Sequence, residues 1–179
     1  KSAGKKLNED ITEFCTDIKK LIAAKSFDEA KNKLLTFFSE KKADPIVVSL
    51  YLECLLALKE FEEIDDFISS LDEETRSDKE IKKITKKINI VKESKNSASI
   101  DVLINKLSEN PKNTDILLEI CEAYFSDEEY DKAFSLLLDN YYKNKEIVKK
   151  KLLEFFEALG NDHDATKTYR KKLSSMMFK

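Results

Sequence analysis

Apolar residues recur three and four positions apart along most of this chain, which is the spacing of one face of an α-helix. Asp44 followed by Pro45 marks a helix start, and Gly160 marks a helix end. A polar stretch over 72–78 is predicted to be a loop. The spacing predicts ten helices, over residues 8–24, 27–41, 45–58, 60–70, 78–94, 98–109, 114–125, 128–142, 145–159 and 162–177.

A short block with one aromatic residue recurs at a helical-repeat spacing. The aromatic residue is Phe27, then Phe61 34 residues later, then Tyr130. The residue three places later is apolar in each block, and Ala98 falls at the same step between them: Ala30, Ile64, Ala98 and Ala133. A period of 34 residues with an aromatic and then a small residue is typical of tetratricopeptide repeat (TPR) helical hairpins.

The predicted fold class is therefore all-α, a TPR-like right-handed solenoid of helical hairpins with about ten helices. Residues 8–41, 45–70 and 114–142 fit the repeat, 78–109 is degenerate, and 145–177 is predicted to close the array. Each hairpin must bury its apolar stripe against a neighbour, and the stacked array offers a groove to other proteins. We expect one domain over 1–179, with residues 1–7 as a linker.

The composition supports helices and argues against several functions. Only two Gly and two Pro occur in 179 residues, and 37% of the residues are charged. A net charge of −3 provides no general attraction for nucleic acid, and no apolar run is long enough to span a bilayer. Lysines over 79–92 alternate with Glu80, without aromatic neighbours, and are expected to form a solvated face.

The end of the chain suggests a family. Residues 109–179 contain the block Tyr130-Asp131-Lys132-Ala133, a helix ending Phe155-Phe156-Glu157-Ala158-Leu159-Gly160, and the tail Tyr169-Arg170-Lys171-Lys172-Leu173 followed by apolar residues. This order resembles the C-terminal TPR domain of bacterial thioredoxin-like co-chaperones, the chaperedoxins. The resemblance covers residue 8 to the end, and the tail is its specific part.

The resemblance implies a thioredoxin-fold domain before Lys1, which we expect to be missing from this chain. It also implies that the TPR part binds unfolded clients or docks on chaperone machinery through the last helix, in a bacterial cytoplasm. No thioredoxin active-site motif is present, so the chain itself is expected not to be an enzyme. A TPR adaptor that assembles another complex is the alternative. We expect protein partners, no nucleic acid, no membrane, no cofactor and a monomer.

Two surfaces are candidate protein-binding sites. The last helix ends in an apolar group beside basic residues: Tyr169, Arg170, Leu173, Met176, Met177 and Phe178. Its apolar residues either dock a partner, aided by adaptable methionines, or seal the array. The first helix of each hairpin should line the inner face, which the repeat register assigns to Ile22, Leu56, Leu118 and Phe125. The mixed charges there do not fit a clamp for acidic tails.

Three cysteines and one histidine provide little chemistry. Cys54 and Cys121 lie on apolar helices and are expected in the core, whereas Cys15 could face the groove. His163 lies between two aspartates and is expected in a solvated turn. No metal-ligand spacing and no nucleophile with a base partner are present.

Overall fold

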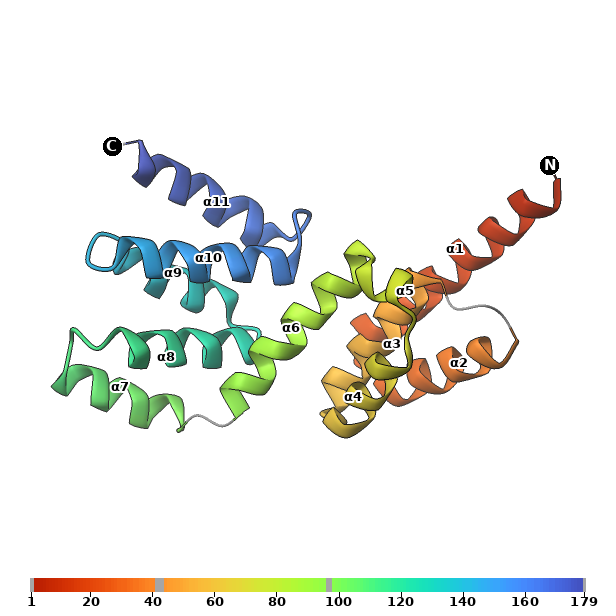
Figure 1. Ribbon diagram of the computed structural model, residues 1–179, viewed down its shortest axis with the longest axis horizontal. Coiled ribbons are helices and arrows are strands. Elements are labelled where there is room, and N and C mark those ends of the chain that lie inside the picture. The colour runs from red at the N-terminus through yellow and green to blue at the C-terminus, as the bar shows by residue number, and fades with distance from the viewer. Residues whose placement is uncertain (1, 41–43, 96–97, 179) are drawn as a thin grey trace. The chain divides into compact units, whose positions relative to one another are not determined.

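The computed structural model describes residues 2–40, 44–95 and 98–178, and side-chain surroundings over 11–38, 44–94 and 98–178. These residues form eleven helices and no strand (Figure 1). The predicted fold class, an all-α TPR-like solenoid of helical hairpins, is confirmed. The chain divides into two compact units, residues 1–84 and 85–179.

The first unit contains α1 (Ser2–Ala23), α2 (Phe27–Glu40), α3 (Pro45–Leu58), α4 (Phe61–Ser70), α5 (Glu73–Ser77) and the start of α6 (Lys79–Lys95). The second contains the rest of α6 and then α7 (Ile100–Glu109), α8 (Thr114–Ser126), α9 (Tyr130–Asp139), α10 (Lys145–Leu159) and α11 (Asp164–Met177). In the first unit α3 packs against α1, α2 and α4. In the second, α8 packs against α7 and α9, and α9 also contacts α10 and α11.

Three hairpin turns have the same backbone structure. In each turn one residue has a positive φ, namely Lys25 (58°), Lys59 (61°) and Glu128 (60°). Its N–H donates to the carbonyl three residues back, and the next N–H donates five residues back, as in Glu129 to Tyr124 at 2.8 Å. This pair of bonds is the Schellman ending of a helix. The first helix of each hairpin therefore stops in the same way.

The recurring aromatic follows each of these turns. Phe27, Phe61 and Tyr130 are the first residues of α2, α4 and α9, and all three are half-buried. The residues three places later, Ala30, Ile64 and Ala133, have no exposed surface. The three blocks therefore play one structural role, as the repeat predicts.

The most apolar helix is central to the first unit. Asp44 caps α3 by accepting a hydrogen bond from the Ile46 N–H at 2.8 Å, and Pro45 occupies the first helical position. Eight residues of α3 are buried: Val47, Val48, Leu50, Tyr51, Leu52, Cys54, Leu55 and Leu56. A helix that is apolar around most of its circumference must be covered on several sides, and α1, α2 and α4 provide that cover.

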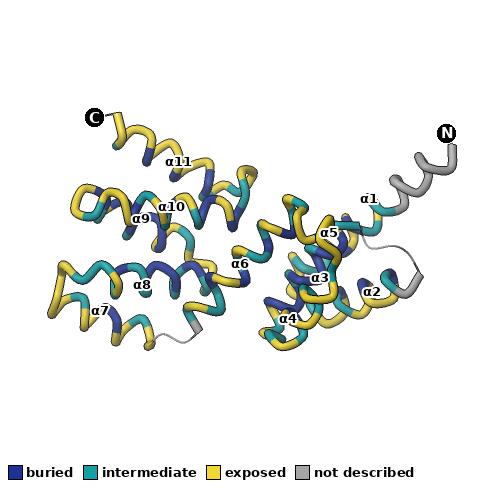
Figure 2. Tube along the Cα trace, in the orientation of Figure 1, coloured by how far each residue is buried: buried dark blue, intermediate teal, exposed yellow. Residues whose placement is uncertain are grey.

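Aromatic rings dominate the core of the second unit. Phe134 stacks on Phe156 with ring centres 5.1 Å apart, and Phe125 lies 4.4 Å from Phe155. All four rings are fully buried. Figure 2 shows buried positions along α8 and α10, whereas the last turns of α11 are largely exposed. Each such side chain contributes on the order of 1.5–3 kcal/mol by burial.

Four details differ from the predictions. The helix predicted to start at residue 8 begins at Ser2, so residues 2–7 belong to the same helix. The loop predicted over 72–78 contains α5. The helix predicted to end at 142 ends at Asp139, where the Tyr141 N–H bonds the Leu138 carbonyl and closes a turn.

The fourth difference concerns the degenerate hairpin. Ala98 precedes α7 and is exposed, so it is not the small packed residue of a second helix. Among the described residues, α7 packs closely on α8 and not along α6. Ile90 of α6 is nevertheless buried in the core of the second unit. In the part of the chain that the structure describes, α6 and α7 therefore do not pack together as the predicted hairpin over 78–109.

Candidate protein-interaction surface

The start of α11 is fixed by a side-chain cap. The N–H of Ala165 donates to Nδ1 of His163 at 3.2 Å, and the His163 ring meets the ring of Tyr130 edge to face at 5.1 Å. His163 is therefore an N-cap in contact with the aromatic residue of the preceding hairpin. Sequence analysis predicted a solvated turn at His163 and did not predict the cap.

Two of the predicted contact residues hold α11 in place. Tyr169 is 3% exposed, its ring stacks on Phe134 at 4.9 Å, and its hydroxyl lies 3.0 Å from Ser135 Oγ. The hydroxyl also donates to the Asp131 carbonyl at 3.2 Å. Leu173 is 5% exposed in the same core. Tyr169 and Leu173 therefore pack against the core. Sequence analysis left this sealing role open beside the docking role.

The end of α11 is different, because it presents apolar side chains to solvent. Phe178 is 88% exposed and Met177 39% exposed. Tyr142, in the turn before α10, is 65% exposed and donates a hydrogen bond from its hydroxyl to the Met176 carbonyl at 3.2 Å. Met176 itself is partly buried against the core. We call Tyr142, Met176, Met177 and Phe178 the C-terminal apolar surface.

A hollow adjoins this surface on the side of α9. It measures about 380 Å³ and is lined by Ser135, Leu138 and Asp139 of α9 and by Tyr169, Lys172, Ser175 and Met176 of α11. Lys172 lies over the Tyr169 ring, with Nζ 4.3 Å from its centre. The hollow thus has an apolar floor with one acidic and one basic residue at its walls. It could hold one large side chain.

Arg170 points to a different neighbour. Its guanidinium lies 5.2 Å from the centre of the Phe156 ring, which belongs to α10. A guanidinium over an aromatic face is weakly attractive, and the arginine stem covers apolar surface. Arg170 therefore also helps to attach α11, although most of its side chain remains exposed.

The predicted inner-face residues are only partly accessible. Ile22 and Leu118 are half-buried, Leu56 is 7% exposed and Phe125 is fully buried against Phe155 and Tyr130. Within the second unit, Phe125 is not accessible, so it does not extend the exposed surface at the end of α11. Phe125 and Leu56 are core residues here, because neighbouring helices cover them.

The second unit is similar to a known family of helical repeats. Residues 93–178 match the tetratricopeptide repeat family model. A crystal structure of a domain of a protein of unknown function from Vibrio parahaemolyticus is similar, at 22% identity and a TM-score of 0.43 over 92% of this chain and 98% of that one. No curated protein matches the chain.

The first helices of the last two hairpins, α8 and α10, are joined by a buried ion pair. Nζ of Lys151 on α10 lies 2.6 Å from Glu122 on α8 and 3.0 Å from Glu154. Burial raises the pKa of the Glu122 carboxyl, and nearby Glu93 and Glu154 add to this effect. Sequence analysis did not find this pair, since Glu122 and Lys151 lie on different hairpins.

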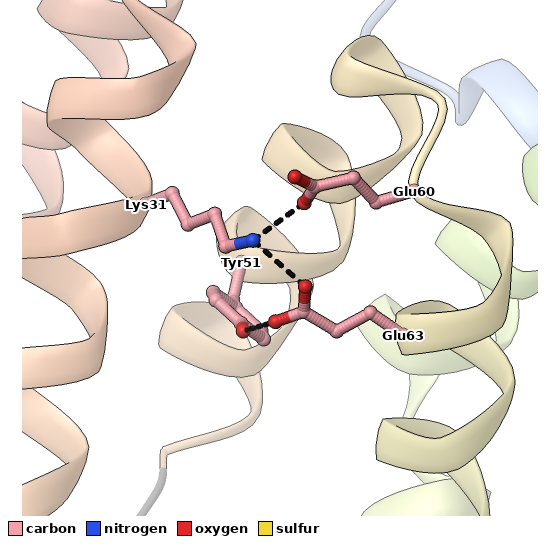
Figure 3. A network of polar contacts seen from close by, with 4 residues as sticks. All are labelled: Lys31, Tyr51, Glu60 and Glu63. Carbon is pink, nitrogen blue, oxygen red and sulfur yellow. Dashed lines mark hydrogen bonds and ion pairs between the residues drawn. The ribbon is translucent and has the colours of Figure 1, made fainter.

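A second polar network joins three helices of the first unit (Figure 3). Lys31 of α2 lies 2.5 Å from Glu60 and 2.7 Å from Glu63 of α4, and the Tyr51 hydroxyl of α3 donates to Glu63 at 2.5 Å. Hydrogen bonds from Lys31 and Tyr51 lower the pKa of the Glu63 carboxyl. Sequence analysis missed this network completely.

The cysteines are poor nucleophiles in this structure. Cys15, Cys54 and Cys121 are all buried, although the sequence allowed Cys15 to face the groove. Burial raises the pKa of each thiol, to about 12 for Cys54. A thiol with a raised pKa carries little thiolate near neutral pH.

Neither a metal-binding cluster nor a membrane-crossing helix occurs among the described residues. In the described part of the chain, no three His, Cys, Asp or Glu side chains are grouped to hold a metal ion. No helix among those residues is both long and apolar enough to cross a bilayer.

Proposed function

We propose that this chain is a non-enzymatic protein-interaction module whose contact region is the C-terminal apolar surface. Tetratricopeptide repeats generally serve as protein-interaction modules, and residues 93–178 match that family. The single observation that carries the proposal is the exposure of Phe178 at 88%, at the end of a helix whose Tyr169 and Leu173 side chains are packed. An aromatic residue at an exposed helix end, beside Met177 and a hollow, is typical of a docking surface.

The finer proposal concerns the kind of partner. The tail Tyr169-Arg170-Lys171-Lys172-Leu173 resembles that of thioredoxin-like co-chaperones, so we propose that the chain acts in protein quality control. Exposed methionine and phenylalanine side chains suit unfolded clients, because such clients present varied apolar segments. The buried thiols support a role by surface contact and not by disulfide exchange.

The test is suppression of aggregation. The chain at equimolar ratio should reduce the light scattering of a heat-unfolded model protein, and the double variant M177S/F178S should lose most of this effect. The matched control is L35S/I46S, which alters two apolar residues that are 43% and 44% exposed in the first unit. Equal loss in both variants, or no suppression by the wild type, would count against the proposal.

A generic adaptor gives a different result in the same experiments. It would bind one folded partner stoichiometrically and leave the scattering of unfolded protein unchanged. That outcome would support a protein-interaction module and contradict the co-chaperone role. Sedimentation of M177S/F178S with such a partner would then show whether the C-terminal apolar surface is the contact.

A further inference from the structure

The basic residues of α11 beside the C-terminal apolar surface have no acidic partners. Residues 165–178 contain no aspartate or glutamate, although the whole chain carries a net charge of −3. Lys171 and Lys172 are exposed, and in the described part of the chain no carboxylate pairs with either of them. Arg170 contacts the Phe156 ring instead of an acidic group. The last helix is therefore a local basic region on an acidic chain.

The turn before α10 adds two more cations to this end of the second unit. Lys143 and Lys145 are exposed and follow Tyr142, whose hydroxyl donates to a carbonyl at the end of α11 at 3.2 Å. Nζ of Lys143 donates to the side chain of Asn140 at 3.2 Å, and Nζ of Lys145 lies 5.9 Å from the centre of the Tyr141 ring. Among the described residues, these two lysines thus contact uncharged groups.

Lysines on other helices are paired with carboxylates. Lys31 pairs with Glu63 at 2.7 Å, and Lys151 pairs with Glu122 at 2.6 Å. The α11 dipole does not replace such a partner, because no basic residue lies in the last turn of that helix. The positive charge beside the C-terminal apolar surface is therefore available to a partner.

Two carboxylates lie close to these cations in the chain. Asp139, the last residue of α9, lines the same hollow as Lys172, and Glu146 follows Lys145 in the first turn of α10. Five cations, from Lys143, Lys145, Arg170, Lys171 and Lys172, outnumber these two carboxylates. The balance favours an acidic partner, with the Asp139 wall of the hollow as its least favourable side.

We propose that the C-terminal apolar surface binds acidic protein segments that carry one bulky apolar residue. The apolar residue enters the hollow of about 380 Å³ beside Met176, and its acidic neighbours lie near Lys171 and Lys172. Apolar contact alone accepts any apolar segment, whereas complementary charge selects among them. This inference rests on the proposed function and names the kind of segment that the surface selects.

The test is fluorescence anisotropy of the full chain with three labelled peptides. Each peptide has one central phenylalanine, flanked by aspartates, by serines or by lysines. At about 0.05 M sodium chloride the aspartate peptide should bind about tenfold more tightly than the serine peptide, and the lysine peptide should bind most weakly. At about 0.5 M the difference between the aspartate and serine peptides should shrink to about twofold, because salt screens exposed charges.

Variants locate the selecting charges. K143Q/K171Q removes two exposed cations and leaves the contact of Lys172 with the Tyr169 ring in place. It should weaken binding of the aspartate peptide about threefold to fivefold and leave binding of the serine peptide unchanged. The matched control K79Q/K82Q removes two exposed lysines of the first unit and should change neither. Asp139→Asn should strengthen binding of the aspartate peptide about twofold.

Several results would overturn the proposal, and they separate it from the proposed function. Equal binding of the three peptides, lost in M177S/F178S, would overturn the selection by charge and support the interaction surface. Binding of no peptide by a chain that still suppresses aggregation would have the same meaning. A preference for the aspartate peptide that M177S/F178S leaves unchanged would place the acidic site elsewhere. A dimer in sedimentation velocity that M177S/F178S dissociates would show that a second copy covers this surface.

Discussion

One position of the repeat is occupied by different chemistry in the two units. Lys31 directly follows the packed Ala30 on α2, and Phe134 directly follows the packed Ala133 on α9. Lys31 reaches the next second helix through ion pairs with Glu60 and Glu63. Phe134 reaches the next second helix through a stacked ring, Tyr169, at 4.9 Å. At this position consecutive hairpins are thus joined by charge in the first unit and by aromatic packing in the second. Elsewhere in the first junction Phe38 contacts Tyr51 and Phe67, and elsewhere in the second Lys151 pairs with Glu122.

The comparison shows that the turn and the junction are independent features of the repeat. The turns before Phe61 and Tyr130 are the same, with Lys59 and Glu128 at positive φ. The turn needs only local hydrogen bonds, so it tolerates either junction. Aromatic packing gains from buried area and shape, whereas the ion pairs lose part of their Coulomb gain to solvent and to desolvation. The aromatic contact at this position is therefore stronger than the ion pairs.

The largest expected effect comes from breaking the aromatic junction. Phe134→Ala removes a fully buried ring that contacts Tyr169, Phe155 and Phe156. The free energy of unfolding of the second unit should fall by about 3–5 kcal/mol, measured by urea titration followed by circular dichroism. A loss below about 1 kcal/mol would show that the rings do not hold this junction.

Breaking the polar junction should cost less. Lys31→Met keeps the length of the side chain and removes its charge, which leaves the partly exposed Glu60 and Glu63 without a cation. We expect a loss of about 1 kcal/mol. A double-mutant cycle with Glu63→Gln measures the coupling between Lys31 and Glu63 directly. An interaction energy near zero would show that this pair does not stabilise the first unit.

Acid titration should distinguish the units by sign. Hydrogen bonds lower the pKa of Glu63, so its contribution is present above the unfolded pKa and is lost as the pH falls through the folded pKa, below about pH 4.3. Burial raises the pKa of Glu122, so the folded state takes up that proton first and its charged form costs stability as the pH rises. The Glu63→Gln variant should therefore show less acid destabilisation than the wild type in urea titrations at pH 3–6. Glu122 contributes with the opposite sign, because its charged form costs stability, so Glu122→Gln should lose less stability than the wild type as the pH rises. Matching pH profiles for both variants would contradict this assignment.

The smallest effect is expected at the turns. Lys59→Gly places glycine at a positive φ and should stabilise the first unit by about 0.5–1 kcal/mol. Glu128→Gly should gain less in the second unit, because Glu128 also pairs with Lys87 at 3.5 Å. Asp66→Gly, at an exposed position inside α4, is the control and should destabilise by a similar amount. Thermal unfolding of the three variants tests this order, and stabilisation by Asp66→Gly would contradict it.

The sequence predicted the features that depend on neighbouring residues. Phe27, Phe61 and Tyr130 stand out because each turn is built from a few consecutive residues. The helix α5 was missed because five residues cannot show an apolar stripe, although Asp72 caps it by accepting the Thr75 N–H at 2.8 Å.

Contacts between repeats were not predictable in the same way. Lys31 and Glu63 are 32 positions apart in the chain, and nothing in either segment indicates the other. Sequence analysis predicted Phe125 on the inner face because the repeat register places that position of the first helix there. In the structure Phe155 of α10 covers it, and that depends on how two hairpins pack.

The difference between the two junctions is tested most directly by hydrogen exchange measured by mass spectrometry at about 0.05 M and 1 M sodium chloride. Salt screens partly exposed ion pairs but not stacked rings, so exchange in α2 and α4 should accelerate about twofold to fivefold at high salt. Exchange in α9 and α11 should stay the same or slow slightly. Equal acceleration in both pairs of helices, or acceleration confined to α9 and α11, would contradict the assignment of charge to one junction and aromatic packing to the other.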